Sequence, residues 1–151
     1  WRHNASVDWH LLEYPEHAGV QRLVRQLNAV YRDQPALWEQ DFDWPGFRWI
    51  DPDDSDQSVL SFLRFPASGG RPVACVANLT PVPRHDYRIG LPQPGRWTEI
   101  FNSDSAAFGG SNILTGAVTA EAPGWNDLDY SATLTLPPLG VLWLAHDPGQ
   151  D

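Results

Sequence analysis

The segment NLTPVPRHDYRIGLP, residues 78–92, places five side chains that donate, accept or carry charge in a row. They are Arg84, His85, Asp86, Tyr87 and Arg88. An acid–base centre would need His85 to face a partner, but adjacent residues on a strand point to opposite faces. Two prolines just before the run remove backbone donors, which favours a strand edge or a connection between strands. The pattern therefore predicts a structural role, with Arg84 or Arg88 pairing with carboxylates.

The other polar clusters do not match the spacing of known catalytic or metal sites. A calcium loop starting at Asp51 would need Gly at its sixth position and Glu at its twelfth, but Asp56 and Phe62 stand there. The histidines form no group at metal-ligand spacing, and no glycine-rich phosphate loop precedes a helix. No two carboxylates are spaced to act together on a sugar. We therefore expect no metal, no cofactor and no catalytic residue here, and a solvated turn at residues 51–56.

The eight tryptophans are the most distinctive feature of the composition. Their flat rings suit the apolar faces of sugars, and they also fill hydrophobic cores. Trp143 lies in an apolar run and is expected in the core, which is also favoured for Trp49 and Trp97. Both readings stay open for four tryptophans in loop-like settings: Trp1, Trp9, Trp44 and Trp125.

The clearest structural pattern predicts a helix over residues 15–33. Apolar residues recur at helical spacing from Val20 to Tyr31. Pro15 suits the first turn, and Pro35 follows the end. A single helix with one apolar stripe must pack on something, so we expect the isolated chain to self-associate.

After residue 35 the sequence changes to short apolar or alternating runs separated by Gly, Pro and Asp. The runs expected to form strands are 46–50, 58–65, 72–79, 86–91, 96–101, 117–122, 131–136 and 140–145. Residues 58–65 and 140–145 carry apolar residues at both parities, which predicts central strands. This spacing, without a second helical pattern, predicts a mainly β fold: an antiparallel sandwich or barrel.

Charge and composition exclude several classes of partner. A net charge of −9 and a pI near 4.8 argue against nucleic acid, and no apolar run is long enough to span a membrane. The single cysteine, Cys75, reads as a small buried hydrophobe. It fits a reducing compartment, so we expect a cytoplasmic protein. The chain starts with Trp1 and contains no methionine, so we expect a piece of a longer protein.

Long stretches of the sequence closely resemble the C-terminal end of bacterial 1,4-α-glucan (glycogen) branching enzymes. They are VDWHLLEYPEHAGVQRLVRQLNAVYRDQPALWEQDFDWPGFRWID, NLTPVPRHDYRIGLPQPGRWTEIFNSDSAAFGGSN and LTLPPLGVLWLA. In that family a (β/α)₈ barrel with an α-amylase-type retaining mechanism precedes a Greek-key-like β-sandwich. The resemblance implies that residues 1–40 are the last loop and closing helix of the barrel, and residues 41–151 the sandwich. It also implies that the catalytic carboxylates lie upstream, so this piece alone would be inactive.

The resemblance also implies a substrate and a partner. The family cleaves α-1,4-glucan and transfers the chain to form α-1,6 branches, so the expected partners are glycogen or starch-like chains and the chain's own upstream barrel. The candidate glucan contacts are Trp1, Asp8, Trp9, Trp44 and Trp125. Three alternatives stay open: a stand-alone carbohydrate-binding sandwich, a purely structural sandwich, and the tail of a related trehalose-metabolising enzyme.

Overall fold

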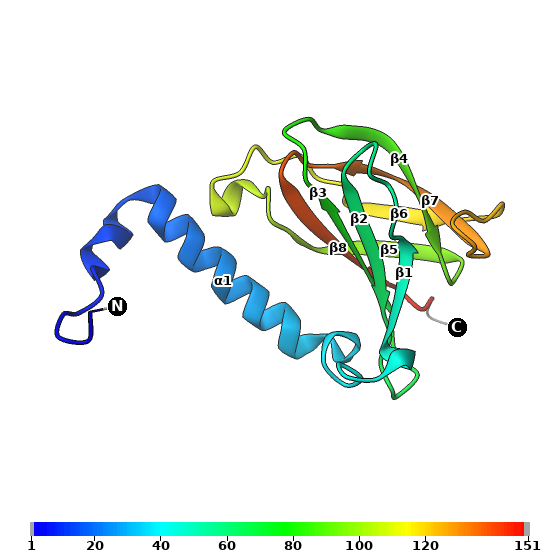
Figure 1. Cartoon of the computed structure of the whole chain (residues 1–151), viewed down its shortest axis with the longest axis horizontal. Coiled ribbons are helices and arrows are strands. Elements are labelled where there is room, and N and C mark those ends of the chain that lie inside the picture. The colour runs from blue at the N-terminus through cyan, green and yellow to red at the C-terminus, as the bar shows by residue number, and fades with distance from the viewer. Residues whose placement is uncertain (1, 150–151) are drawn as a thin grey trace.

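The computed structural model describes residues 2–149 as an eight-stranded β-sandwich preceded by one long helix (Figure 1). The elements are η1 (Trp9–Glu13), α1 (Pro15–Asp33), η2 (Pro35–Leu37), η3 (Trp44–Gly46), β1 (Phe47–Asp51), β2 (Val59–Arg64), β3 (Val73–Asn78), β4 (Arg84–Leu91), β5 (Gly95–Asn102), η4 (Ala106–Phe108), β6 (Ala117–Ala120), β7 (Tyr130–Leu136) and β8 (Gly140–His146). The predicted helix and all of the predicted strands are confirmed.

The strands form two antiparallel sheets. The larger sheet has the order β1-β2-β3-β8-β5-β6, and β4 pairs with β7 in the smaller one. The chain leaves the larger sheet after β3, forms β4, and returns as β5 on the far side of β8, which agrees with the expected Greek-key-like sandwich. Strands β2 and β8 have a neighbour on each side, so their predicted central positions are confirmed.

The main core lies between the two sheets. Trp97 is fully buried there among Leu142, Leu144 and Ile89, and its Nε1 donates a hydrogen bond to the carbonyl of Gln93 at 3.2 Å. Along β7, Ala132, Leu134 and Leu136 are buried and Thr133 is exposed, although Ser131 on the same side as Thr133 is buried too. The two sheets are therefore held together by their apolar inner faces.

A second, smaller core covers the outer face of the larger sheet. Val30 of α1 and Leu37 of η2 pack there against a group on β3 and β8 that includes Val73 and Cys75. Because β3 is covered on both faces, its sequence is apolar at both parities. Cys75 is buried as predicted, and burial raises the pKa of its thiol to about 12, although the charge of Arg64 acts in the opposite direction.

Helix α1 touches the sandwich with part of its apolar stripe, since Val30 is buried there, and with a second position near its N-terminal end. Gly19 is buried against the β5–β6 loop, where a Cβ would lie 2.3 Å from the carbonyl oxygen of Phe108. Other residues of the stripe stay exposed, with Val20 at 63%, Val24 at 48% and Tyr31 at 44%. Figure 1 shows that η1 lies beyond the end of α1, on the side away from the sandwich.

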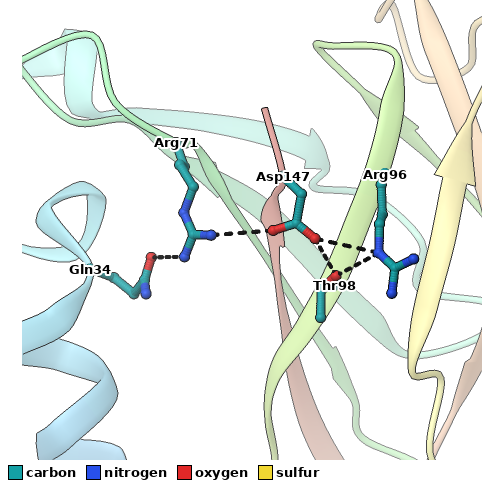
Figure 2. Close-up of polar contacts among 5 residues, drawn as sticks. All are labelled: Gln34, Arg71, Arg96, Thr98 and Asp147. Carbon is teal, nitrogen blue, oxygen red and sulfur yellow. Dashed lines mark hydrogen bonds and ion pairs between the residues drawn. The ribbon is translucent and has the colours of Figure 1, made fainter. Parts of the chain in front are cut away.

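A polar network fixes the other end of α1. Arg71 donates hydrogen bonds to the side chain of Gln34, at 3.3 Å, and to Asp147, at 3.2 Å (Figure 2). Asp147 also accepts a hydrogen bond from Thr98 and lies 3.5 Å from Arg96. The network joins the C-terminal end of α1 to β5 and to the residue that follows β8. Within residues 2–149, no helix combines the length and apolar character of a membrane span.

The core prediction for Trp49 was wrong, since 43% of this side chain is exposed. Trp49 lies on β1, which is an edge strand and is therefore covered less than a central one. Its ring packs edge-on against Phe47 and Phe62. Trp143 is half-buried and packs against the smaller core beneath α1.

Candidate functional site

The predicted glucan contacts do not lie together in the structure. Trp1 lies outside the described residues, while Asp8 and Trp9 are at the N-terminal groove described next. Trp44 opens η3 and is 88% exposed. Trp125 lies in the loop between β6 and β7. The sequence therefore pointed to three separate places on the surface.

The N-terminal groove is an open, apolar channel of ≈ 600 Å³ between η1 and α1. Its residues are Val7, Asp8, Trp9, Leu11, Leu12, His17, Val20, Gln21, Val24, Arg25 and Asn28. Val7 and Trp9 are 69% and 62% exposed, although both are large and apolar. Exposed apolar surface of this kind is typical of a protein–protein contact rather than of a site for a polar ligand.

The most completely built polar site is a pocket of ≈ 330 Å³ around Trp125, referred to below as the Trp125 pocket. Three segments form it: the β1–β2 turn, the first half of β4 and the β6–β7 loop. The lining residues are Asp51, Asp54, Gln57, His85, Asp86, Tyr87, Arg88 and Trp125. Four of the five residues of the RHDYR run and two aspartates of the acidic turn thus meet in one cavity.

A β-bulge brings two neighbouring residues of β4 to this pocket. Arg84 pairs with Leu136 and Tyr87 with Leu134, so β4 has one residue more than β7 between these pairs. Asp86 has a φ of +55°, a left-handed conformation that Asp tolerates better than most residues. His85 and Asp86 therefore line the same cavity, and the prediction that they point to opposite faces was wrong.

Asp54 and Tyr87 form the wall of the pocket on the side of the β1–β2 turn. The hydroxyl of Tyr87 donates to Asp54 Oδ2 at 2.6 Å, and the backbone N–H of Gln57 donates to Oδ1 at 3.2 Å. Burial, this hydrogen bond and the charges of Asp54 and Asp51 together raise the pKa of Tyr87 well above its ordinary value. Tyr87 consequently stays protonated and acts as a donor rather than as a base.

Arg88 and Trp125 form the opposite wall. The guanidinium of Arg88 lies 4.8 Å from the centre of the Trp125 ring and donates to Ser131 Oγ at 2.9 Å and to the carbonyl of Pro123 at 2.8 Å. Arg84 donates to the carbonyl of Gln57 at 3.0 Å. The prediction that Arg84 or Arg88 pairs with carboxylates was wrong, because both donate hydrogen bonds to backbone carbonyls of the segments that form the pocket.

A glycine and an asparagine bring the β6–β7 loop close to β4. A Cβ on Gly90 would lie 2.0 Å from the carbonyl oxygen of Trp125, so only glycine permits this approach. Asn126 accepts a hydrogen bond from the N–H of Gly90 at 3.1 Å and donates to Asp51 at 3.1 Å. Hydrogen bonds therefore link the three segments of the pocket to one another.

The Trp125 pocket presents hydrogen-bonding groups beside an aromatic surface. It offers carboxylate acceptors and the ring of Trp125, a residue that is 49% exposed, whereas the proton of the Tyr87 hydroxyl is already donated to Asp54. Within residues 2–149, no group of three or more His, Cys, Asp or Glu side chains is arranged to hold a metal ion. Sequence reasoning missed the contributions of Asp54, Tyr87 and Arg88, because only the fold brings their segments together.

Comparison with known proteins places the fold in a family. Residues 49–147 match the family described as alpha amylase, C-terminal all-beta domain. The chain belongs to this family. Its match covers β2 to β8 and all of the residues that line the Trp125 pocket.

Curated relatives are similar to the chain over nearly its whole length. The 1,4-alpha-glucan branching enzyme GlgB of Aquifex aeolicus (strain VF5) is 49% identical over 148 residues, which are 97% of this chain and 24% of that relative. The enzyme of the same name from Cereibacter sphaeroides is 54% identical over 145 residues, 95% of this chain and 20% of the relative. The resemblance to branching enzymes is thus confirmed, and the chain spans about a fifth to a quarter of these relatives.

The similarity to solved structures is weaker. The trehalulose synthase MutB from Pseudomonas mesoacidophila MX-45 is 21% identical, with 80% of this chain and 16% of that chain covered and a TM-score of 0.48. This likeness is too weak to bear on function.

Proposed function

We propose that the chain is the C-terminal segment of a 1,4-α-glucan branching enzyme, in which it supports an upstream catalytic barrel. The observation that carries this proposal is the identity of about half of all residues over 95–97% of the chain, helix and sandwich included, with proteins named as branching enzymes. A barrel upstream would perform the reaction of those enzymes, transferring α-1,4-glucan chains to form α-1,6 branches on glycogen or starch-like chains. The segment alone would then be inactive.

The exposed face of α1 supports this role. The N-terminal groove and the apolar stripe together present Val7, Trp9, Val20, Val24 and Tyr31 to solvent, each at least 44% exposed. Burying an apolar side chain of this size is worth about 1.5–3 kcal/mol. We propose that residues 1–40 complete the barrel and bury this face, and that residues 41–151 form the sandwich.

Two predicted contacts fit the same arrangement. Asp8 and Trp9 lie at the far end of the chain from the sandwich, where they would belong to the barrel and stand near its substrate. The stand-alone carbohydrate-binding module is not favoured, because the similar proteins are four to five times longer than the chain, judged by the 20–24% of their length that it covers. A trehalose-metabolising parent is not favoured either, since the relatives at this level of identity are named as branching enzymes.

The test is to purify the full-length natural protein that contains this sequence, to measure its intact mass, and to assay it for new α-1,6 linkages on amylose. We expect a mass several times the 16.9 kDa of this chain, together with branching activity. The chain by itself serves as the matched control and should form no branches. A full-length natural protein that lacks branching activity would overturn the proposal.

A further inference from the structure

The outer face of β1 and β2 carries three aromatic rings in mutual contact, Phe47, Trp49 and Phe62, referred to below as the outer aromatic cluster. Trp49 lies opposite Phe62 across the strand pair. The ring centres are 4.9 Å apart for Phe47 and Trp49, 5.3 Å for Phe47 and Phe62, and 6.1 Å for Trp49 and Phe62. The rings therefore form one continuous apolar surface across two strands rather than scattered surface side chains.

The opposite face of the same two strands is apolar as well. Ile50 of β1 and Val59 and Leu63 of β2 are buried in the main core between the sheets. An antiparallel strand with one face in water normally alternates apolar and polar residues. Because β1 and β2 place aromatic residues on the face that points away from the main core, their sequence is typical of strands that are covered on both faces.

Helix α1 covers only the neighbouring part of this face. Val30 of α1 and Leu37 of η2 pack over β3 and β8, and Phe62 lies at the border of that smaller core. The cover ends there among the described residues, since Trp49 on the edge strand is 43% exposed. The chain then runs from the end of α1 through η2 and η3 into β1 (Figure 1). The apolar surface beneath α1 thus continues without a break into the outer aromatic cluster.

The shape of the cluster favours a protein as its partner. Small ligands bind in concave sites, but neither the N-terminal groove nor the Trp125 pocket includes any of the three rings. Tryptophan and phenylalanine are enriched at the centres of protein–protein interfaces, where a ring packs against apolar side chains of the partner. A flat group of three rings suits such a contact.

The position of the cluster favours one particular partner. The rings lie on the same face of the larger sheet that α1 covers, so a domain packed against the exposed side of α1 stands next to them. The proposed function places an upstream domain against Val20, Val24 and Tyr31 of that helix. The chain covers only 20–24% of its branching-enzyme relatives, which leaves a domain of sufficient size to reach both surfaces.

We propose that the outer aromatic cluster is a docking surface for the domain that precedes this chain in the full-length natural protein. Apolar side chains of that domain pack on Trp49, and Phe47 and Phe62 support its ring. The inference rests on the proposed function, which supplies the upstream domain. It adds a contact made by the sandwich itself, separate from the exposed face of α1 and η1, so the sandwich is held at two places.

The test is hydroxyl-radical footprinting of the full-length natural protein without glucan, with Trp125 as the internal reference. Trp49 and Trp125 are the same residue type and are 43% and 49% exposed, so without docking they should be labelled at similar rates. Docking should lower the labelling of Trp49 relative to Trp125 by about fivefold, since the centre of an interface excludes water.

Two variants of the full-length protein test the role of the ring. Trp49→Lys places a charge in the contact and should raise the labelling of Phe47 and Phe62 severalfold, whereas Trp49→Phe keeps an aromatic ring and should leave both protected. Trp125→Lys is the matched control on the β6–β7 loop and should also leave them protected. The measurement on the unsubstituted protein stands even if Trp49→Lys disturbs the edge strand.

Two results would overturn the inference. One is equal labelling of Trp49 and Trp125 in the full-length protein, and the other is protection of Trp49 that disappears on dilution, which would assign the cluster to a second copy. A protein that forms α-1,6 branches and leaves Trp49 reactive would contradict this inference alone. A protein that protects Trp49 and forms no branches would contradict only the proposed function.

Discussion

Asp104 holds the long β5–β6 loop in place, and replacing it should release the loop together with its contact to α1. Its carboxylate accepts hydrogen bonds from the N–H of Ser111 at 2.9 Å, the Oγ of Ser111 at 2.7 Å and the N–H of Ile113 at 2.8 Å. The clamped loop carries Ala107, whose carbonyl accepts a hydrogen bond from Arg22 of α1 at 2.7 Å. One carboxylate thus connects the sandwich to the helix.

The size of the effect follows from these three hydrogen bonds. Bonds to a charged group contribute about 1.5–3 kcal/mol each when buried. Asp104 is only half-buried, so water replaces part of each bond and we take about 1 kcal/mol apiece. Asp104→Ala should lower the free energy of unfolding by about 2–3 kcal/mol. Asp104→Asn should lower it by about 1 kcal/mol, because its amide nitrogen cannot accept the bond from the N–H of Ser111.

The same contacts predict a dependence on pH. Burial alone would raise the pKa of Asp104, but the hydrogen bonds from Ile113 and Ser111 outweigh it and lower the pKa below its ordinary value of 3.8. Since the folded state has the lower pKa, the stabilisation is present above the unfolded pKa and is lost as the pH falls through the folded pKa. The difference in stability between the parent chain and Asp104→Asn should therefore be constant from pH 5 to 7 and shrink below about pH 4.

The assay combines urea unfolding at several pH values with hydrogen exchange at pH 7. In Asp104→Ala the amides of Ser111 and Ile113 should exchange faster, as should those of the first turns of α1. Asp53→Asn removes a charge from an exposed turn and should change the stability by less than about 0.5 kcal/mol. Unchanged exchange at Ser111 and Ile113 in Asp104→Ala would refute the reasoning.

The remaining predictions concern the cores and the exposed helix. Trp97→Ala should lower the free energy of unfolding by about 3–5 kcal/mol, because the side chain is fully buried between the sheets; urea unfolding checks this, and a loss below 1 kcal/mol would contradict it. Asn78→Ala should lower the free energy of unfolding by about 2–3 kcal/mol, because the buried amide of Asn78 donates hydrogen bonds to the carbonyls of Val82 and Pro137. Thermal unfolding measures this loss, and Asn4→Ala, at an exposed position, is the control. Val24→Glu should reduce self-association of the isolated chain without loss of stability, because Val24 is an exposed apolar residue of α1. Sedimentation velocity measures the association. Unchanged association would mean that the chains do not contact one another through this face of α1.

Local patterns were sufficient to predict the elements of this fold. The helix over residues 15–33 has one apolar stripe with prolines near both ends, and each strand is bounded by Gly, Pro or Asp, so neighbours along the chain specify these elements. The central positions of β2 and β8 were also visible, because strands covered on both faces need apolar residues at both parities.

The Trp125 pocket could not be predicted in the same way. The bulge at Asp86 is defined only by the pairing of β4 with its partner strand β7. Alternation along β4 alone predicts that His85 and Asp86 point to opposite faces, whereas both line the same pocket. The pocket joins segments more than 30 residues apart, such as Asp54 and Tyr87. Trp49 was misplaced for a related reason: sequence shows that β1 is a strand but not that it is an edge.

The central claim is that the exposed face of α1 and η1 is the interface with an upstream domain. The most direct measurement is hydroxyl-radical footprinting of Trp9 and Tyr31, in the isolated chain and in the full-length natural protein that contains it. Both side chains are largely accessible in the chain alone, at 62% and 44%. The account predicts that Trp9 and Tyr31 become strongly protected in the full-length natural protein. Trp44, which is 88% exposed, should stay reactive in both proteins. Equal labelling of Trp9 and Tyr31 in the two proteins would contradict it.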